Sequence, residues 1–176
     1  MKIETARLLL REMTPDDLPA LEAIMRDEQT MYAYNGAFTT PDIEAWLNKQ
    51  RENYRKWGFG LWAVVLKATG EMIGQCGLTM QDYNGTQVLE VGYLFQRAYW
   101  HQGYASEAAI ACKRYAFDEL KAQEVYSLIK DDNQASMNVA LRNGMVKVGS
   151  FVKFYRGINM GHYAFCVRKI EEKKSR

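Results

Sequence analysis

Cysteine, histidine and long apolar runs are scarce in this sequence of 176 residues. No stretch approaches the ~20 apolar residues that a helix needs to cross a bilayer, and the first residues lead into a strand pattern rather than a signal peptide. The three cysteines are odd in number and far apart, so they form neither a disulfide framework nor a metal-ligand spacing: Cys76, Cys112 and Cys166. We therefore expect a cytoplasmic protein with no membrane segment and no metal site.

An excess of one charge is also missing, because 23 lysine and arginine residues balance 21 aspartate and glutamate residues to a net charge of +2. The only basic cluster lies in residues 171–176, where we expect a frayed and solvated tail. Nucleic acid is therefore not an expected partner. Internal repeats, low-complexity segments and linkers are absent as well, which favours a single domain over residues 1–170.

Two amphipathic helices are predicted after a first buried strand at Leu8–Leu10. Both begin at a Thr-Pro-Asp sequence, in which threonine caps the first turn, proline suits the first helical position and aspartate favours the helix dipole. The two starting sequences are Thr14–Asp17 and Thr40–Asp42. The second helix is expected to end near Trp57 and Gly58, since glycine commonly terminates helices.

Segments rich in β-forming residues follow, and they predict an antiparallel meander of three strands: Leu61–Leu66, Met72–Met80 and Thr86–Phe95. The dipeptide Asn84-Gly85 is a strong signal for a hairpin turn. Beyond the meander, helix and strand patterns alternate: a helix around Ala105–Leu120, a strand at Val125–Ile129, a helix at Gln134–Arg142, and strands around Val146–Tyr155 and Tyr163–Val167. The order β-α-α-β-β-β-α-β-α-β-β indicates an α+β fold.

An anion site is indicated where the third meander strand turns into the following helix, within Glu90–Ala108. The first N–H groups of a helix have no intrahelical partners and lie at the positive end of its dipole. Successive amides from Gln102 to Ser106 can therefore converge on a phosphate, and Gly103 allows the backbone to approach it. The alternative interpretation is an ordinary turn before a packed helix.

Three motifs carry a resemblance to a known family: Glu90-Val-Gly-Tyr93, Tyr99-Trp-His-Gln-Gly-Tyr-Ala-Ser-Glu-Ala108, and Asn133–Met145. In this order they resemble the successive motifs of the GNAT superfamily of N-acetyltransferases. The opening segment Thr5–Arg11 resembles the first strand of the branch that acetylates the N-terminal alanine or serine of ribosomal proteins. The likeness extends over nearly the whole chain.

This resemblance implies a GNAT-like acyl-CoA N-acyltransferase fold, in which a mixed, mostly antiparallel and splayed sheet is flanked by four helices. Strands Thr86–Phe95 and Val125–Ile129 would part, and the pantetheine arm of acetyl-CoA would lie between them as an added strand beside Leu94, Phe95 and Gln96. The pyrophosphate would bind the turn and the helix start, namely Gln102, Gly103, Tyr104, Ala105 and Ser106. Acetyl-CoA is therefore the expected co-substrate.

Glu90 is the candidate general base for amine acetylation. The reaction needs a neutral amine near the thioester, a route for its proton, and a proton for the leaving thiolate. Glu90 lies beside the expected splay and could remove the amine proton directly or through water, if burial raises its pKa. Alternatively, Glu90 is a strand carboxylate that pairs across the sheet or binds a backbone turn.

Asn133 and Ser136 stand at the start of the helix after the splay, where the resemblance implies contact with the cofactor arm and the thioester sulfur. Asn133 is also expected as a simple N-cap. Many family members carry a tyrosine that protonates the thiolate, but this chain has Ala140 at the matching position. Ser136 or water is then the candidate proton donor.

The implied activity is acetyl transfer to a primary amine, with a protein N-terminus as the expected acceptor. Two alternatives stay open: an acetyltransferase for a small amine, such as a polyamine, an aminoglycoside or an amino acid, and a catalytically silent acyl-CoA-binding module. Asp82 and Glu28 are the only acidic residues that hint at a polycationic acceptor, and the acidic position usual in the last hairpin of the ribosomal branch corresponds to Gly161. The protein is expected to be a monomer or a homodimer.

Aromatic side chains are the candidates for the wall of the acceptor pocket, because they occur at helix ends and strand turns: Tyr32, Tyr34, Phe38, Trp57, Tyr83, Tyr155 and Tyr163. The same residues could instead pack in the core or at an interface. His162 is a further candidate on the substrate side.

Overall fold

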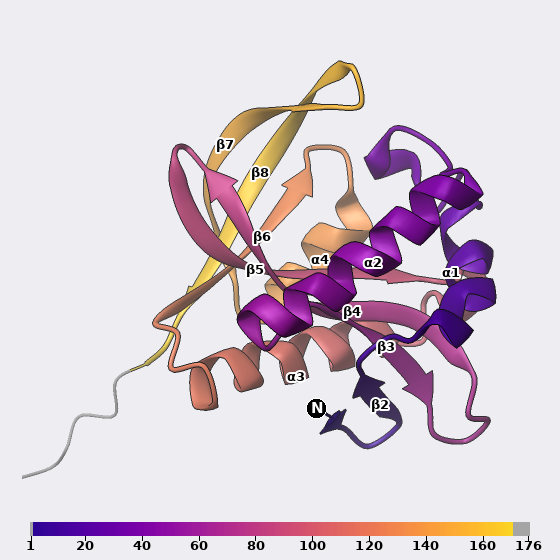
Figure 1. Ribbon diagram of the computed structural model, residues 1–176. Coiled ribbons are helices and arrows are strands. Elements are labelled where there is room, and N and C mark those ends of the chain that lie inside the picture. Colours follow the sequence, from indigo (N-terminus) through magenta and orange to yellow (C-terminus); the bar gives the residue numbers. More distant parts are fainter. Residues whose placement is uncertain (1, 171–176) are drawn as a thin grey trace, which may run out of the picture.

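An eight-stranded sheet forms the centre of the structure, a computed structural model that describes residues 2–170 (Figure 1). Its strand order is β1-β2-β3-β4-β5-β6-β8-β7. The strands are β1 (Lys2–Glu4), β2 (Leu8–Arg11), β3 (Leu61–Leu66), β4 (Met72–Tyr83), β5 (Thr86–Phe95), β6 (Glu124–Lys130), β7 (Val146–Tyr155) and β8 (Ile158–Arg168). Neighbouring strands run antiparallel except β5 and β6, which are parallel. The tail predicted at 171–176 lies outside the described residues.

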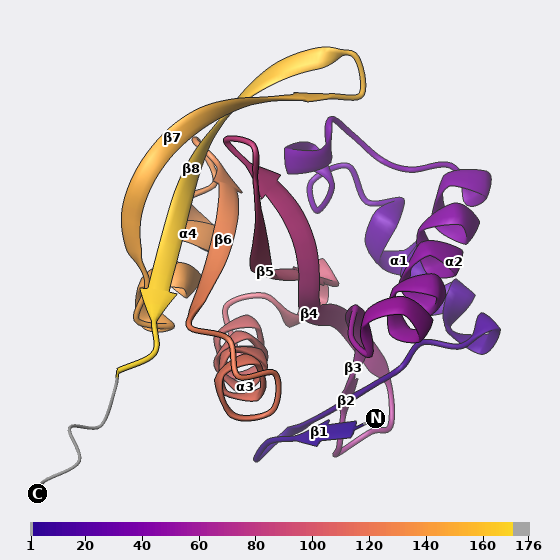
Figure 2. The same cartoon turned by 60° about the vertical axis from the view of Figure 1, so that its left-hand side comes forward.

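Four α-helices flank this sheet within residues 2–170: α1 (Leu18–Met25), α2 (Thr40–Trp57), α3 (Tyr104–Asp118) and α4 (Gln134–Arg142). Helices α1 and α2 cover one face, whereas α3 and α4 cover the other (Figure 2). No helix in the described part of the chain is long and apolar enough to span a membrane. The prediction of an α+β fold, with a mixed, mostly antiparallel sheet and four helices, is confirmed.

Strand β3 shows how the middle of the sheet is fixed, because its side chains are buried alternately in the two cores. Trp62 and Val64 pack into the core under α3 and α4. Leu61, Ala63 and Val65 pack into the core under α1 and α2. A one-residue slip would exchange these two sets, so burial on both faces specifies the register strongly. The neighbouring strands β4 and β5 are thereby held on a rigid base.

Two helix starts differ from the sequence prediction. Residues Pro15–Asp17 form a short 3₁₀ turn, and α1 begins only at Leu18. Helix α2 is capped by Thr39 rather than Thr40, because Thr39 and Asp42 form a reciprocal capping box in which each side chain accepts from the backbone N–H of the other. The predicted end of α2 is confirmed, since Gly58 adopts a left-handed φ of 74°.

Three strand boundaries also differ from the prediction. A short edge strand, β1, precedes the predicted first strand and pairs with it. Strand β4 continues to Tyr83, and β8 begins already at Ile158, because backbone pairing with β5 and with β7 continues through these residues. The predicted turn between β4 and β5 is confirmed, since Asn84 and Gly85 both have positive φ angles, 52° and 78°.

The sheet parts between β5 and β6, as the resemblance implied. These strands are in register at one position, Glu90 opposite Tyr126. Beyond it, side chains replace backbone pairing: Ser127 Oγ donates to Val91 O at 2.9 Å, and Leu128 N donates to a carboxylate oxygen of Glu90 at 3.1 Å. Glu90 therefore marks the point at which the sheet separates into two halves.

Glycine is required where β4 passes the residue before β3, and this gives a first prediction. A Cβ added to Gly77 would lie 2.0 Å from Gly60 O, a backbone atom that cannot rotate away. We expect Gly77→Ala to lower the free energy of unfolding by about 1–3 kcal/mol, as overpacked core substitutions do. Gly92→Ala is the matched control, because Gly92 pairs with Gly77 and its added Cβ would meet only Leu61 Cδ2, at 3.6 Å. Equal denaturant midpoints for the two variants would contradict the prediction.

Candidate active site

The turn before α3 presents free backbone amides, as the sequence predicted. Gly103 is the N-cap of α3 and has a φ of 80°, which a residue with a side chain adopts only under strain. The amides of Tyr104, Ala105 and Ser106 donate to no acceptor within residues 2–170, and Glu107 N is the first to bond, to Gly103 O. Three N–H groups at the positive end of a 15-residue helix could bind an anion of the size of a phosphate, and we refer to them as the anion site.

The side chains of Trp100 and Gln102 hold this turn in place. Trp100 Nε1 donates to Phe95 O at 2.9 Å, which fixes the turn to the end of the strand. Gln102 Nε2 donates to Ala98 O at 3.2 Å, so the Gln102 side chain folds back within the turn. The contribution of Gln102 to an anion site would therefore come from its backbone.

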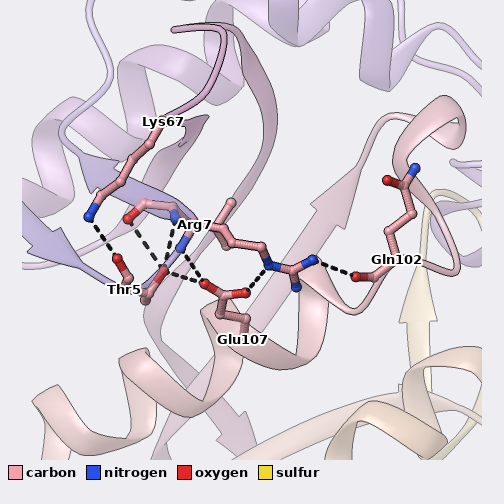
Figure 3. Close-up of polar contacts among 6 residues, drawn as sticks. Thr5, Arg7, Lys67, Gln102 and Glu107 are labelled. Carbon is pink, nitrogen blue, oxygen red and sulfur yellow. Dashed lines mark hydrogen bonds and ion pairs between the residues drawn. The ribbon is translucent and has the colours of Figure 1, made fainter.

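Arg7 and Glu107 join the turn to the first strands, a contact that the sequence interpretation missed (Figure 3). The side chain of Arg7 binds Glu107 at 2.7 Å and donates to Gln102 O at 3.0 Å. Thr5 Oγ1 also donates to Glu107 at 2.6 Å, and Lys67 Nζ donates to Thr5 O at 2.7 Å. Residues 100 positions apart in the sequence thus brace the helix start.

The brace also places a cation beside the anion site. Burial raises the pKa of Glu107, but hydrogen bonds from Thr5 and Arg7 outweigh it, so the pKa of Glu107 is lowered and the carboxylate is charged. The Arg7 guanidinium lies 4.3 Å from the centre of the Tyr104 ring. Its Nη2 lies 3.5 Å from where a Cβ on Gly103 would be. The Arg7 side chain is 45% exposed, so it can reach a phosphate that approaches the turn.

Gln96 is held by hydrogen bonds to β4 and to the turn before α3. Its backbone N–H donates to Ile73 O at 2.9 Å, its side-chain Nε2 donates to Met72 O at 3.0 Å, and its backbone carbonyl accepts from Tyr99 N at 2.9 Å. Leu94 packs with the core under α1 and α2, and Phe95 belongs to the core under α3 and α4. The end of β5 is therefore firmly placed along the opening between β5 and β6.

Glu90 combines partial burial with hydrogen bonds to both carboxylate oxygens. One oxygen accepts from Leu128 N at 3.1 Å, and the other accepts from Thr79 Oγ1 at 3.3 Å. Burial raises the pKa of Glu90, while the Leu128 amide, the charge of Lys153 and the Thr79 hydroxyl oppose the shift. The backbone-bound carboxylate considered as an alternative is thus present, and its raised pKa makes it a stronger base than an ordinary glutamate.

The start of α4 faces the same opening. Asn133 is the N-cap, since its side chain accepts from Ser136 N at 3.1 Å. Ser136 O accepts from the hydroxyl of Tyr93 at 2.9 Å, a link from β5 to α4 that the sequence interpretation missed. Within residues 2–170 the Ser136 hydroxyl itself has no hydrogen-bond partner. Ala140 is buried on the same helix, one turn further on.

Some of the predicted aromatic residues gather near Glu90. Tyr34, Phe38 and Tyr155 form edge-to-face contacts at 6.3 and 6.1 Å, and Trp46, which was not predicted, joins them at 5.8 Å from Tyr34. Burial raises the pKa of Tyr34, and the charge of Glu90 raises it further, so the phenol stays neutral beside the carboxylate. This cluster covers the face of the sheet on which Glu90 lies.

The other predicted aromatic residues are dispersed. Trp57 stacks on Phe59 at the end of α2, and Tyr163 packs with the core under α3 and α4. Tyr83 contacts Phe151 across the curled sheet at 5.3 Å. Tyr32 lies beside Lys130, whose Nζ is 5.4 Å from the ring centre. They therefore do not form one pocket wall.

The tip of the β7–β8 hairpin arches over to the segment before α2 (Figures 1 and 2). Arg156 donates to Tyr34 O at 3.1 Å and to Gly36 O at 3.0 Å. Its guanidinium also lies 4.7 Å from the centre of the Phe38 ring, and Asn35 Nδ2 donates to Arg156 O at 3.3 Å. The hairpin thus bridges the side of the sheet on which Glu90 and the aromatic cluster lie.

The acidic residues that hinted at a polycationic acceptor bind backbone N–H groups of turns. Glu28 accepts from Ala37 N at 3.2 Å, and Asp82 accepts from Gly85 N at 3.2 Å. Asp131 lies against Gly161, where an added Cβ would meet Asp131 Oδ2 at 2.2 Å. A carboxylate from the β6–α4 loop therefore occupies the space of the missing side chain at position 161.

His162 is buried in β8 on the concave face of the sheet, next to Phe151 at 5.4 Å. Its Nδ1 lies 3.0 Å from Met160 O, so in the neutral ring this nitrogen carries the proton. Burial lowers the pKa of His162, and the nearby charges of Lys153 and Lys130 lower it further. His162 is therefore uncharged at neutral pH.

The cysteines are structural. Cys76 and Cys112 are buried with their sulfur atoms 3.6 Å apart, and Cys166 is buried as well. Burial raises the pKa of Cys76, which keeps its thiol protonated and unreactive. Among residues 2–170 no group of three or more histidine, cysteine, aspartate or glutamate side chains could hold a metal ion.

Comparisons with known proteins agree with this geometry. The Acetyltransferase (GNAT) domain family matches residues 7–146. YkkB of Bacillus subtilis is 37% identical over 145 residues, covering 82% of this chain and 84% of YkkB. The N-acetyltransferase YnaD of Bacillus subtilis is 33% identical over 155 residues, covering 87% of each chain. A GNAT-family acetyltransferase from Bacillus anthracis superposes with a TM-score of 0.80 at 27% identity, over 96% of this chain and 98% of that one. With a family match that spans most of its length, this chain belongs to the GNAT acetyltransferases and uses acetyl-CoA as its acetyl donor.

Proposed function

We propose that this protein transfers the acetyl group of acetyl-CoA to a primary amine, which belongs either to a protein N-terminus or to a small molecule. The observation that carries the proposal is the joint position of two features at the parting of β5 and β6. A phosphate-sized set of free amides begins α3, and a carboxylate with a raised pKa, Glu90, lies where the strands separate. The free amides suit the phosphates of acetyl-CoA, and the carboxylate suits the acceptor amine.

The chain offers a continuous surface for acetyl-CoA. The pyrophosphate would bind the amides from Gln102 to Ser106, with Arg7 beside them. The pantetheine arm would follow the end of β5 at Leu94, Phe95 and Gln96, and the side chain of Asn133 and the hydroxyl of Ser136 would face the thioester end. When bound, acetyl-CoA supplies an activated carbonyl that a neutral amine can attack directly.

Glu90 accepts the proton of the acceptor amine in this proposal, directly or through one water molecule. Its two hydrogen bonds keep the carboxylate at the strand junction, and burial keeps its pKa above that of an ordinary glutamate. Ser136, or a water molecule bound to its hydroxyl, passes a proton from solvent to the leaving sulfur, because this hydroxyl has no other partner in the described part of the chain.

Of these two acceptor classes, the hairpin arch favours the small amine. Arg156 holds the tip of the β7–β8 hairpin against Tyr34 and Gly36, which narrows the approach to Glu90 from that side. An extended peptide needs an open groove. A silent acyl-CoA-binding module would keep the phosphate site, and its binding of acetyl-CoA would not change on removal of Glu90.

We place the activity in the cytoplasm, because the three buried cysteines are unpaired, and in a monomer or homodimer.

A direct assay separates these acceptors. Release of free CoA thiol is measured with acetyl-CoA and three acceptor sets: peptides with free N-termini, the same peptides with acetylated N-termini, and small primary amines. We expect turnover with at least one set of free primary amines and none with the blocked peptides. Turnover confined to small amines would select the small-molecule acceptor, and no turnover with any amine would contradict the enzymatic proposal.

A further inference from the structure

A pocket of about 490 Å³ opens on the concave face of the sheet, between the end of the β4–β5 hairpin and β7. It is lined by Gln81, Asp82 and Asn84 on one side and by residues 150–153 on the other. The two sides meet because the sheet curls, so that Tyr83 packs on Phe151 at 5.3 Å. A pocket of this size suits a small molecule rather than a protein surface.

This pocket is connected to Glu90 by side-chain hydrogen bonds. Gln81 Nε2, in the pocket wall, donates to Thr79 Oγ1 at 3.1 Å, and Thr79 Oγ1 donates to the Glu90 carboxylate at 3.3 Å. Lys153, in the opposite wall, is close enough for its charge to lower the pKa of Glu90. A molecule in the pocket is therefore linked to the proposed base through Gln81 and Thr79.

Lys153 gives the pocket a positive charge that no neighbouring carboxylate neutralises by contact. It forms no ion pair within residues 2–170, and its Nζ lies 5.6 Å from the centre of the Tyr155 ring. Asp82, the acidic residue of the lining, accepts from Gly85 N in the hairpin turn. The neighbouring His162 is uncharged. An anionic group of a ligand is the natural partner for such a cation.

We infer that the acceptor carries a carboxylate next to its amine, as an α-amino acid or a close analogue does. The amine lies at Glu90 and the carboxylate at Lys153, so the pocket selects small zwitterionic acceptors. This inference rests on the proposed acetyl transfer and narrows its acceptor to one class of small amine. A polyamine places a second cation near Lys153, and a protein N-terminus has a peptide carbonyl where the pocket expects a carboxylate.

Matched acceptors test the inference. Free amino acids, the corresponding amino acid amides, and the decarboxylated amines, such as tyrosine, tyrosinamide and tyramine, are compared by kcat/KM in the wild type. We expect the acids to be the best acceptors. Lys153→Met should lower the ratio of kcat/KM for acid over amine roughly ten- to one-hundredfold, the range for a hydrogen bond to a charged group. Any effect of Lys153 on Glu90 is common to both acceptors and cancels in this ratio.

Lys147→Met is the matched control. Lys147 lies on the same strand but on the opposite face, with its Nζ 3.2 Å from the centre of the Tyr163 ring. The acid-to-amine ratio should not change in Lys147→Met, whereas Lys153→Glu should favour the amine over the acid. A wild type that acetylates amines or peptides as well as it acetylates acids overturns the inference. An acid-to-amine ratio that does not change in Lys153→Met overturns it as well.

Failure of the inference and failure of the proposed function are distinguishable. A protein that acetylates peptides or amines in preference to acids is an acetyltransferase of another acceptor class. A protein that is stabilised by acetyl-CoA but acetylates no member of the panel, amino acids included, contradicts the inference. A folded protein that acetyl-CoA does not stabilise contradicts the donor site itself.

Discussion

Gly103→Glu should abolish the stabilisation of this protein by acetyl-CoA. A ligand that binds only the native state at 100 times its Kd stabilises it by about 2.7 kcal/mol, which the melting temperature reports. In the variant, a glutamate side chain stands at the N-cap of α3, beside the three free amides, and its Cβ would lie 3.5 Å from Arg7 Nη2. Whether it pairs with Arg7 or occupies the amides, it excludes and repels a phosphate. We therefore expect no rise in melting temperature with acetyl-CoA.

Gly70→Glu is the matched control for this variant. Gly70 also has a positive φ, 74°, and an added Cβ there would meet no atom within 4 Å. It lies in the turn between β3 and β4. Backbone strain should therefore cost both variants a similar free energy of unfolding in the absence of acetyl-CoA. The phosphate-turn assignment is wrong if Gly103→Glu keeps the full stabilisation that Gly70→Glu shows.

Elements defined by local signals were predicted well from the sequence. The turn at Asn84-Gly85, the end of α2 at Gly58 and the whole span of α4 depend on residues a few positions apart, so their positions can be read directly. The cap of α2 was misplaced by one residue because two adjacent threonines precede Pro41, and only the contact with Asp42 distinguishes Thr39 from Thr40.

The supports of the candidate site were not predictable in the same way. Arg7 and Glu107 meet across 100 residues, Tyr93 and Ser136 across 43, and Arg156 meets Gly36 across 120. No local period or cap marks these pairs. Their positions follow from how β5 and β6 part and how the hairpin arches, which are properties of the packed sheet.

The acidic residues illustrate the same limit. In the sequence, Asp82 and Glu28 are simply carboxylates near expected turns. In the structure each accepts a backbone N–H and is committed to its own loop. The free charge on the acceptor side is instead Lys153, a strand residue with no motif around it. The two carboxylates that hinted at a polycationic acceptor are therefore bound to their own turns, and the acceptor class inferred from the structure depends on a lysine instead.

Glu90→Gln should lower kcat by about 100- to 1000-fold, the scale of general-base catalysis. Glutamine has the same shape, can still accept from Leu128 N and can donate to Thr79 Oγ1, so the strand junction should persist. Acetyl-CoA should stabilise the variant as it does the wild type, because Glu90 is absent from the phosphate turn. A silent acyl-CoA-binding module would instead have no turnover for Glu90→Gln to reduce.

The free energy of unfolding is a second readout for Glu90→Gln, and we expect it to change in the opposite direction to the activity. Because burial raises the pKa of Glu90 in the folded protein, the folded state binds its proton more tightly than the unfolded state does. The contribution of Glu90 to the free energy of unfolding is therefore largest at low pH, and it is lost as the pH rises from the unfolded pKa through the folded pKa. Above that window Glu90→Gln should be at least as stable as the wild type, although it has lost activity. A loss of stability equal to that of a core mutation would identify Glu90 as purely structural.

Thr79→Val completes the argument by moving the pKa of Glu90 without removing the base. The Thr79 hydroxyl lowers that pKa, so its loss should raise the pKa further. The acid limb of the kcat profile should then shift to higher pH, while the rate at the alkaline plateau is largely kept. Glu90→Gln should remove the same limb altogether. If neither substitution moves the limb, the proton of the acceptor amine leaves by another group on this face, and the uncharged His162 becomes the residue to replace.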